Sequence, residues 1–426
     1  MCATMRWLPV SGGQRAPLQE ERADQGGRSY TVLRHRDFRL LWGAQFVSTI
    51  GSQMQQVAIA WQVYQLTGNA LSLGILGLVR VGPILFFGLF GGVLADRWDR
   101  RRLLILSQFL LCTSSTGLAV IALADISSLS AIYALTFLGA AFAAFAGPTR
   151  QALIPALVPR RELAGAMSVS VLASQVATVS GPAVSGWLIA WKGVDLVYFF
   201  DAASFLVVAV AVMALRTRPP ISKAHGTAFA AAMQGIAFLR GSSILLGVMS
   251  VDFVATFFGA SMTLMPIFAQ DILKVGPSGL GILYAAPAAG SVIGSTFMTI
   301  RSFPARPGAG VLLAIAVYGL MAVVFGLSRS FELSLLVLAA GGAADSVSMA
   351  LRATIRNLVT PDHLLGRVSA AHSMFAMGGP QLGEFESGLV ASFIGAGPTV
   401  AIGGLGTLLS CAVIAAIIPA IRHYRV

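Results

Sequence analysis

Of the 426 residues, 56% are hydrophobic and only 11% are charged, and the mean hydropathy is +0.80. Soluble globular proteins carry about 25% charged residues, so a soluble fold of this composition could not cover its exterior with polar side chains. The same hydrophobic content excludes an intrinsically disordered chain. The composition therefore predicts an all-α polytopic membrane protein.

The chain has 29 Lys and Arg residues against 17 Asp and Glu residues, a formal net charge of +12. In a soluble protein this excess would suggest a nucleic-acid partner. In a membrane protein it is expected from the enrichment of Lys and Arg in cytosolic loops, so no nucleic-acid partner is predicted. The cysteines (Cys2, Cys112 and Cys411) are too scattered for a disulfide framework. No His/Cys cluster suggests a metal, and no cofactor is expected.

A membrane-spanning helix needs about 20 mostly apolar residues. Residues 1–37 are polar and Arg-rich, without the apolar stretch of a secretory signal, and predict a cytosolic tail. Twelve candidate spans follow in chain order: 39–64, 70–95, 103–124, 128–148, 165–190, 194–215, 242–270, 278–300, 308–327, 331–351, 368–392 and 397–421. Packed membrane helices tolerate the prolines that fall within four of them, Pro83, Pro182, Pro287 and Pro380.

The distribution of basic residues predicts the orientation of these spans. With the N-terminus in the cytosol, the basic residues outside the cytosolic segments are Lys192, Lys274, Arg329 and Arg80, the last within a span. Because cytosolic loops collect Lys and Arg, we expect both termini in the cytosol and an even number of helices.

The chain also repeats itself. Three pairs of segments match between its first and second parts: Leu73-Gly74-Ile75-Leu76 with Leu280-Gly281-Ile282-Leu283, residues 150–159 with 352–361, and Gly181-Pro182 with Gly379-Pro380. Parallel repeats around a central binding site are a recurrent transporter design. The predicted organisation is a tail over 1–37, six-helix halves over 38–215 and 241–426, and a cytosolic linker over 216–240.

The loop after the second span carries the most specific motif, Gly92-Val93-Leu94-Ala95-Asp96-Arg97-Trp98-Asp99-Arg100-Arg101-Arg102. It resembles the loop signature of the major facilitator superfamily, with Asp99 in place of a glycine. The resemblance implies a gating role for Gly92, Asp96, Arg97, Arg100 and Arg101. Asp96 would interact with the positive N-terminal end of a neighbouring helix and bias the balance of conformations. The alternative is an arginine cluster that only sets topology.

The fifth span contains Ala177-x-x-x-Gly181-Pro182-x-x-Ser185-Gly186. This pattern resembles the antiporter motif of the same superfamily, with Ala177 and Ser185 at two glycine positions. It implies export and gives a role to Gly181, Pro182 and Gly186. Ordinary close packing of helices through small residues is the alternative.

Two further stretches, Phe38-Arg39-Leu40-Leu41-Trp42 and residues 252–269, resemble the bacterial subgroup of enterobactin exporters and macrolide efflux proteins. The resemblance covers nearly all of the chain after residue 30. It implies the major facilitator fold, with twelve transmembrane helices in two pseudo-symmetric halves. It also implies a monomer in the bacterial inner membrane, with a small molecule and protons as partners.

Ionisable residues inside a membrane are costly and are candidates for function. The second, seventh, tenth and eleventh spans contain Arg80, Asp252, Asp345, Glu384 and Glu386. Arg80 and Glu384 are predicted at similar depth on helices that meet between the halves, where a pair would satisfy the guanidinium. Glu384 and Glu386 cannot point the same way on a helix, so one is expected to pair with Arg80 and the other to face the cavity or be protonated. A static ion pair is the alternative.

Asp252 is expected beside the central cavity, near the repeat-equivalent of Gln45 in the first span. It either binds a proton or a cationic substrate group, or is bonded within the bundle. Asp345 is expected to pair with Arg352 or Arg356.

Other function classes fit less well. Gly276-Pro277-Ser278-Gly279 matches a string found in intramembrane serine proteases, but it lies at an expected turn, and His372 would come from another depth. No phosphate-binding G-x-x-x-x-G-K-[ST] string is present, so an ion gradient is the expected energy source. The chain is therefore predicted to be a secondary transporter and not an enzyme. The favoured function is proton-coupled efflux of a small amphipathic molecule. Proton-coupled uptake is the alternative, and an intramembrane hydrolase a distant one.

Overall fold

The computed structural model describes residues 29–97, 99–216, 241–259, 261–300, 304–361 and 364–424. Residues 1–28 of the predicted tail and 217–240 of the predicted linker lie outside this range. Within it, every regular element is a helix, which confirms the all-α class.

The first group of helices covers the first six predicted spans. It consists of η1 (Ser29–Arg34), α1 (Arg36–Thr67), α2 (Ala70–Arg97), α3 (Arg100–Leu123), α4 (Leu129–Leu157), η2 (Arg160–Glu162), α5 (Leu163–Lys192) and α6 (Val194–Met213). The second group consists of α8 (Ser243–Phe258), η3 (Ser261–Leu264), α9 (Met265–Ile267), η4 (Phe268–Ile272), α10 (Gly276–Ile300), α11 (Pro307–Leu327), α12 (Phe331–Val359), α13 (Leu365–Ile394), α14 (Ala396–Ile417) and α15 (Pro419–His423).

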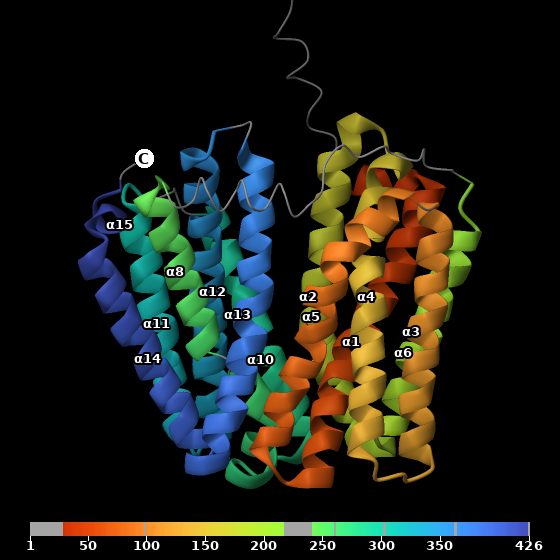
Figure 1. The fold of residues 1–426 in the computed structure, drawn as a ribbon, viewed down its shortest axis with the longest axis horizontal. Coiled ribbons are helices and arrows are strands. Elements are labelled where there is room, and N and C mark those ends of the chain that lie inside the picture. The colour runs from red at the N-terminus through yellow and green to blue at the C-terminus, as the bar shows by residue number, and fades with distance from the viewer. Residues whose placement is uncertain are drawn as a thin grey trace, which may run out of the picture.

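Helices α1–α6 form one bundle and α8–α15 a second bundle beside it (Figure 1). The two bundles contact each other mainly through α2 with α13 and through α5 with α10. We call the end of the molecule at which α1 begins the arginine-rich end, because Arg36, Arg101, Arg160 and Arg216 lie there. The opposite end carries the turns after Thr67, Leu123 and Leu327.

Nine helical segments of the described residues are long and apolar enough to cross a membrane, and Ala70–Pro83 of α2 forms a shorter apolar stretch. All twelve predicted ranges are largely helical, but α1 and α13 are not among the nine. The six glutamines of α1 lower its hydropathy, and the part of α13 whose side chains the structure describes without a gap, residues 379–394, is shorter than a span. The predicted prolines lie inside α2, α5, α10 and α13, as expected.

Glycines bring the two bundles into close contact. A Cβ atom built on Gly186 of α5 would lie 2.8 Å from Cα of Gly281 in α10. At the other crossing, a Cβ atom on Gly74 of α2 would lie 2.9 Å from Cα of Gly388 in α13. Ordinary contacts of this kind begin near 3.4 Å, so neither crossing has room for a side chain. Backbone-to-backbone packing of this kind holds membrane helices together where hydrophobic burial does not.

Candidate functional site

A cavity of about 720 Å³ lies mainly within the first bundle. Its wall is formed by α1, α3, α4 and α5, with single contributions from α2 and α6 and two residues of α13. Along α1, the residues that line the cavity run from Phe38, near the start of the helix, to Ile59. The volume lies within the range of small-molecule sites, about 300–1,000 Å³.

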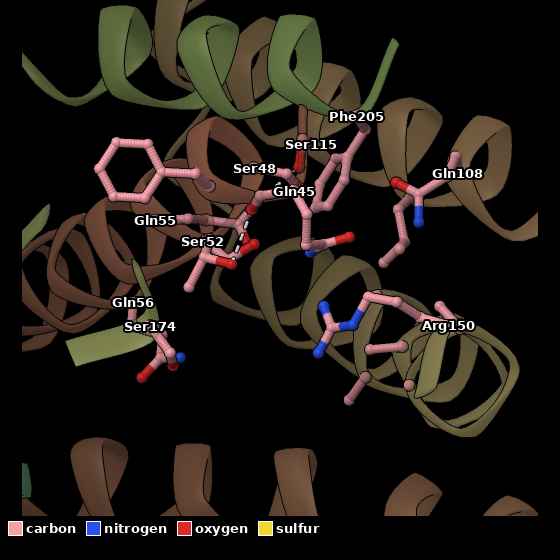
Figure 2. A pocket seen from close by; sticks show the side chains of 18 of the residues that line it. Gln45, Ser48, Ser52, Gln55, Gln56, Gln108, Ser115, Arg150, Ser174 and Phe205 are labelled. Atoms are coloured by element: carbon pink, nitrogen blue, oxygen red, sulfur yellow. Dashed lines mark hydrogen bonds between the residues drawn. The ribbon is translucent and has the colours of Figure 1, made fainter. Parts of the chain in front are cut away.

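Hydroxyl and amide side chains dominate the polar part of this wall. They are Gln45, Ser48, Thr49, Ser52, Gln55, Gln56, Gln108, Ser114, Ser115, Thr136, Ser170, Ser174 and Gln381. Figure 2 shows several of them around one space, with the guanidinium of Arg150 extending towards it from α4. Uncharged donors and acceptors of this kind orient a ligand without setting its charge.

A smaller cavity of about 180 Å³ lies where the bundles meet. It is lined by residues of α1, α2 and α5 from the first bundle, and by Met262, Thr263, Tyr284 and Glu384 from the second. Gln56, Arg80 and Glu384 line both cavities. Arg80 and Glu384 therefore lie on one site between the halves, as their predicted depths had indicated.

The direct ion pair between these two residues is not formed. In the described part of the chain, no acid lies within 4.0 Å of Arg80, and its Nη2 atom is buried without a hydrogen-bond partner. Glu384 packs instead against Gly77, where a Cβ atom would lie 2.9 Å from Cβ and 3.1 Å from Oε2 of Glu384. Gly77 thus provides the space that the glutamate side chain occupies.

The other three carboxylates singled out in the sequence lie elsewhere. Glu386 is half-buried, accepts a hydrogen bond from Ser387 Oγ at 3.5 Å and is outside the two cavity linings. Asp252 is buried in α8 and forms an ion pair with Arg352 of α12. Asp345 lies 3.6 Å from Arg352, the partner expected for it. Neither Asp252 nor Arg352 is in the lining of the two cavities formed by the described residues.

The side chains of Asp96, Arg97 and Arg100 and the surroundings of Gly92 lie outside what the structure describes, although the backbone of these residues belongs to α2 and α3. Two neighbours show how the loop is held. Asp99 caps α3, accepting from the backbone amides of Arg101 and Arg102 at 2.8 and 3.1 Å.

The side chain of Arg101 reaches across to the end of α6, where Nη2 donates to the carbonyl oxygen of Met213. A cation at a helix C-terminus is favourable, because the unpaired carbonyls there carry partial negative charge. The departure from the superfamily motif at Asp99 therefore supplies a helix cap.

The residues of the antiporter pattern face two different partners. Gly181 packs against α1, where a Cβ atom would lie 2.6 Å from Cβ of Gln53. Ser185 is fully buried and donates to the carbonyl oxygen of Met54 at 2.9 Å. Gly186 faces α10 of the other bundle, and the carbonyl oxygen of Pro182 lies against Gly281. Close packing accounts for all these contacts, and the role in export stays a prediction.

The sequence analysis missed Asp201, which is fully buried in α6. Its carboxylate accepts hydrogen bonds from Ser115 at 2.6 Å and from Ser52 at 3.5 Å, and Gln55 donates to Ser115 at 2.6 Å. Ser52, Gln55 and Ser115 line the larger cavity, so Asp201 lies directly behind its wall. The available signal was an acid in the middle of the apolar span 194–215.

Two apolar helical bundles, with a polar cavity mainly within the first, have the architecture of the major facilitator fold. Solved structures support this fold. The bacterial homologue of the human lysosomal transporter Spinster, in an inward-facing and unoccupied conformation, matches with a TM-score of 0.69 and 17% identity over 93% of this chain and 96% of that one. A mutant of the nucleoside transporter NupG matches with a TM-score of 0.71 and 12% identity over 90% of this chain and 100% of that one.

Residues 28–423 match the family model described as transmembrane secretion effector, and the chain belongs to this family of the major facilitator superfamily. The enterobactin exporter EntS of Shigella dysenteriae serotype 1 (strain Sd197) is 28% identical over 392 residues, which cover 92% of this chain and 94% of the relative. EntS of Escherichia coli (strain K12) matches with the same identity and coverage. The protein is a multi-pass membrane transporter and not an enzyme, so Ser278 and His372 need no catalytic explanation.

Proposed function

We propose that this protein exports a small amphipathic molecule across the bacterial inner membrane in exchange for protons, by alternating access between the two bundles. The observation that carries the proposal is the position of Glu384, which lines the substrate-sized cavity and also packs into the contact between the bundles. A carboxyl in that position can gain or lose a proton while it touches both the ligand space and the moving interface. The arginine-rich end faces the cytosol in this proposal.

The structure favours Glu384 over the other carboxylates as the proton carrier. Asp252 is already bonded to Arg352, and Glu386 lies outside both cavity linings. Arg80 lines both cavities with Glu384 and has an unpaired buried nitrogen. When the proton leaves Glu384, the resulting carboxylate can pair with Arg80, which would give the two protonation states different contacts. A ligand or proton shifts a conformational equilibrium only through such a difference.

Export, rather than uptake, is supported by the similarity to the enterobactin exporters and by the antiporter pattern at Gly181, Pro182 and Gly186. The range of substrates includes siderophores and drugs, and we take enterobactin and erythromycin as probes. The runner-up is proton-coupled uptake of a small organic solute. The two directions are distinguished by the sign of the gradient that drives accumulation.

The experiment uses inside-out membrane vesicles with an acidic interior. For an exporter, the proton gradient drives accumulation of a probe in the vesicles, and a protonophore abolishes it. Glu384→Gln should remove the dependence on the gradient. Glu386→Gln and the exposed Glu332→Gln are matched controls that should retain it.

Accumulation of both probes that is indifferent to the protonophore would contradict proton coupling. Gradient-driven accumulation that persists in Glu384→Gln would contradict the role of this carboxyl. Accumulation driven by a gradient of the opposite sign would favour uptake.

A further inference from the structure

Two arginines at equivalent positions of the two bundles have different surroundings. The match of Leu73-Gly74-Ile75-Leu76 with Leu280-Gly281-Ile282-Leu283 puts Gln45 of α1 in register with Asp252 of α8. The match of residues 150–159 with 352–361 puts Arg150 of α4 in register with Arg352 of α12. The acid of the second bundle is thus replaced by an amide in the first, while the arginine is kept in both.

In the second bundle, acids of the same bundle compensate the charge of the arginine. Arg352 is buried, is paired with Asp252 and lies 3.6 Å from Asp345. A buried guanidinium needs such partners, because removing a charge from water costs several kcal/mol unless an opposite charge or hydrogen bonds compensate it.

In the first bundle the equivalent pair faces the larger cavity. Arg150 and Gln45 both line it, and both point into it in Figure 2. Oε1 of Gln45 is buried and makes no hydrogen bond, and among the described residues no acid lies within 4.0 Å of Arg150. The carboxylate that the described lining does contain, Glu384, is shared with Arg80 at the second cavity, whose lining does not include Arg150.

We propose that Arg150 and Gln45 form a subsite for an anionic group of the transported molecule, a carboxylate or another oxyanion. The ligand's anion would take the position relative to Arg150 that the Asp252 carboxylate takes relative to Arg352. A guanidinium suits this task because it stays charged and can bind two oxygens at once. The amide of Gln45 adds a hydrogen bond to the bound oxyanion.

An apolar surface next to this subsite completes the substrate class. Trp42 and Phe46 lie on either side of Gln45 along α1 and line the same cavity. Their rings are stacked, with centroids 6.0 Å apart and an interplanar angle of 6°. Trp42 is held in place by a hydrogen bond from its Nε1 atom to the carbonyl oxygen of Val169 at 3.3 Å. The proposal rests on the transport function proposed above and makes the substrate an amphipathic organic anion with an aromatic or other flat apolar part.

The test is equilibrium binding by calorimetry to the purified full chain in a neutral detergent, with 2-naphthoate and 2-naphthamide as probes. The two share a ring system and differ in charge. The wild type should bind the anion at least about tenfold more tightly than the amide, since only the anion can form charge-assisted hydrogen bonds with the guanidinium.

Arg150→Gln should abolish this preference because it removes the cation. Gln45→Asp should also abolish it, because the new carboxylate would pair with Arg150 as Asp252 pairs with Arg352. Arg150→Lys should keep part of the preference. Arg160→Gln, which removes an exposed charge at the same end, should keep all of it. Unchanged binding of the amide shows that a variant is folded.

Equal binding of both probes by the wild type, or no binding of the naphthoate, would overturn the proposal. So would a preference that survives both Arg150→Gln and Gln45→Asp. Displacement of the naphthoate by phosphatidylglycerol, at concentrations that leave the amide bound, would assign the subsite to a lipid headgroup and overturn it as a substrate site. No proton gradient is used, so this result and the vesicle result can fail independently.

Discussion

In the structure the two bundles touch where α5 crosses α10, and a substitution at this contact should shift the balance between conformations. Replacing Gly281 by alanine places a Cβ atom 2.9 Å from Cα of Gly186 and closer still to the carbonyl oxygen of Pro182. Both obstacles are backbone atoms, so neither can rotate away. Contact at an ordinary distance of 3.4 Å requires the two helices to separate by roughly half an ångström or more.

The expected energy follows from the cost of overpacking, about 1–3 kcal/mol for an added methyl group without space. This cost falls on the state in which α5 and α10 touch here, and not on a state in which the bundles have separated at this crossing. A difference of about 1–3 kcal/mol changes the ratio of two states by about 5- to 150-fold. Gly281→Ala should therefore populate conformations opened at the opposite end of the molecule.

The assay is electron–electron double resonance between spin labels at Ser127→Cys and Arg329→Cys, which are exposed at the opposite end of the first and second bundle. The native cysteines are replaced by alanine beforehand. Gly281→Ala should add or enlarge a population at longer distance. Gly43→Ala is the matched control, because its Cβ atom meets nothing within 4 Å. Identical distance distributions for the wild type and for both glycine variants would refute the reasoning.

Three further predictions follow from hydrogen bonds in the structure. Asp201→Asn should lower the free energy of unfolding in detergent by about 1–3 kcal/mol, because an amide cannot accept from both serines as the carboxylate does. Thermal denaturation measures this change, and an unchanged value would show that these bonds contribute nothing. Tyr64 donates from the first bundle to Asp271 of the second, so Tyr64→Phe should lengthen the same spin-label distances, whereas Tyr133→Phe, whose hydroxyl bonds within its own bundle, should not. Asp99→Ala should cost about 1 kcal/mol of stability by removing the cap of α3, and Asp99→Ser should restore most of it.

The positions of the helices could be predicted from the sequence because they depend on local properties. Some ends could not: α4 and α12 continue to Leu157 and Val359, beyond the predicted spans, and the predicted span 242–270 is interrupted after Phe258. A long apolar run has one stable form in a bilayer, and prolines inside it are tolerated by packed helices. Even the exception at α1 is informative, since three of the glutamines that lower its hydropathy, Gln45, Gln55 and Gln56, line the larger cavity.

The composition of the site was less predictable, because it depends on contacts between distant helices. The internal repeat places Gln45 and Asp252 at nearly equivalent positions, but only the fold shows that Arg352 pairs with Asp252 while Gln45 faces the cavity. Asp201 was missed for a related reason. Its neighbours in the chain, Phe199, Phe200, Ala202 and Ala203, are apolar, and its serine partners come from α1 and α3.

The crossing of α2 and α13 differs from that of α5 and α10 in a way that bears on coupling. By the repeat, Glu384 stands where α5 has Gly186, yet Gly186 meets the backbone of Gly281 directly. At the α2–α13 crossing the close backbone contact is made instead by Gly388 with Gly74, and Glu384 occupies the space beside Gly77.

At Gly186 and Gly281 the first crossing is therefore a contact between backbone atoms, whereas the second includes, at Glu384, an ionisable side chain exposed to the ligand space. Protonation can change the energy of the second crossing directly, but not that of the first. We therefore expect Gly77→Ala, which displaces the Glu384 side chain, to alter the proton dependence of transport in the vesicle assay. Gly281→Ala should alter the balance of states with that dependence retained. The opposite pattern, with proton dependence lost in Gly281→Ala and kept in Gly77→Ala, would place the coupling at α5 and α10 and contradict this assignment.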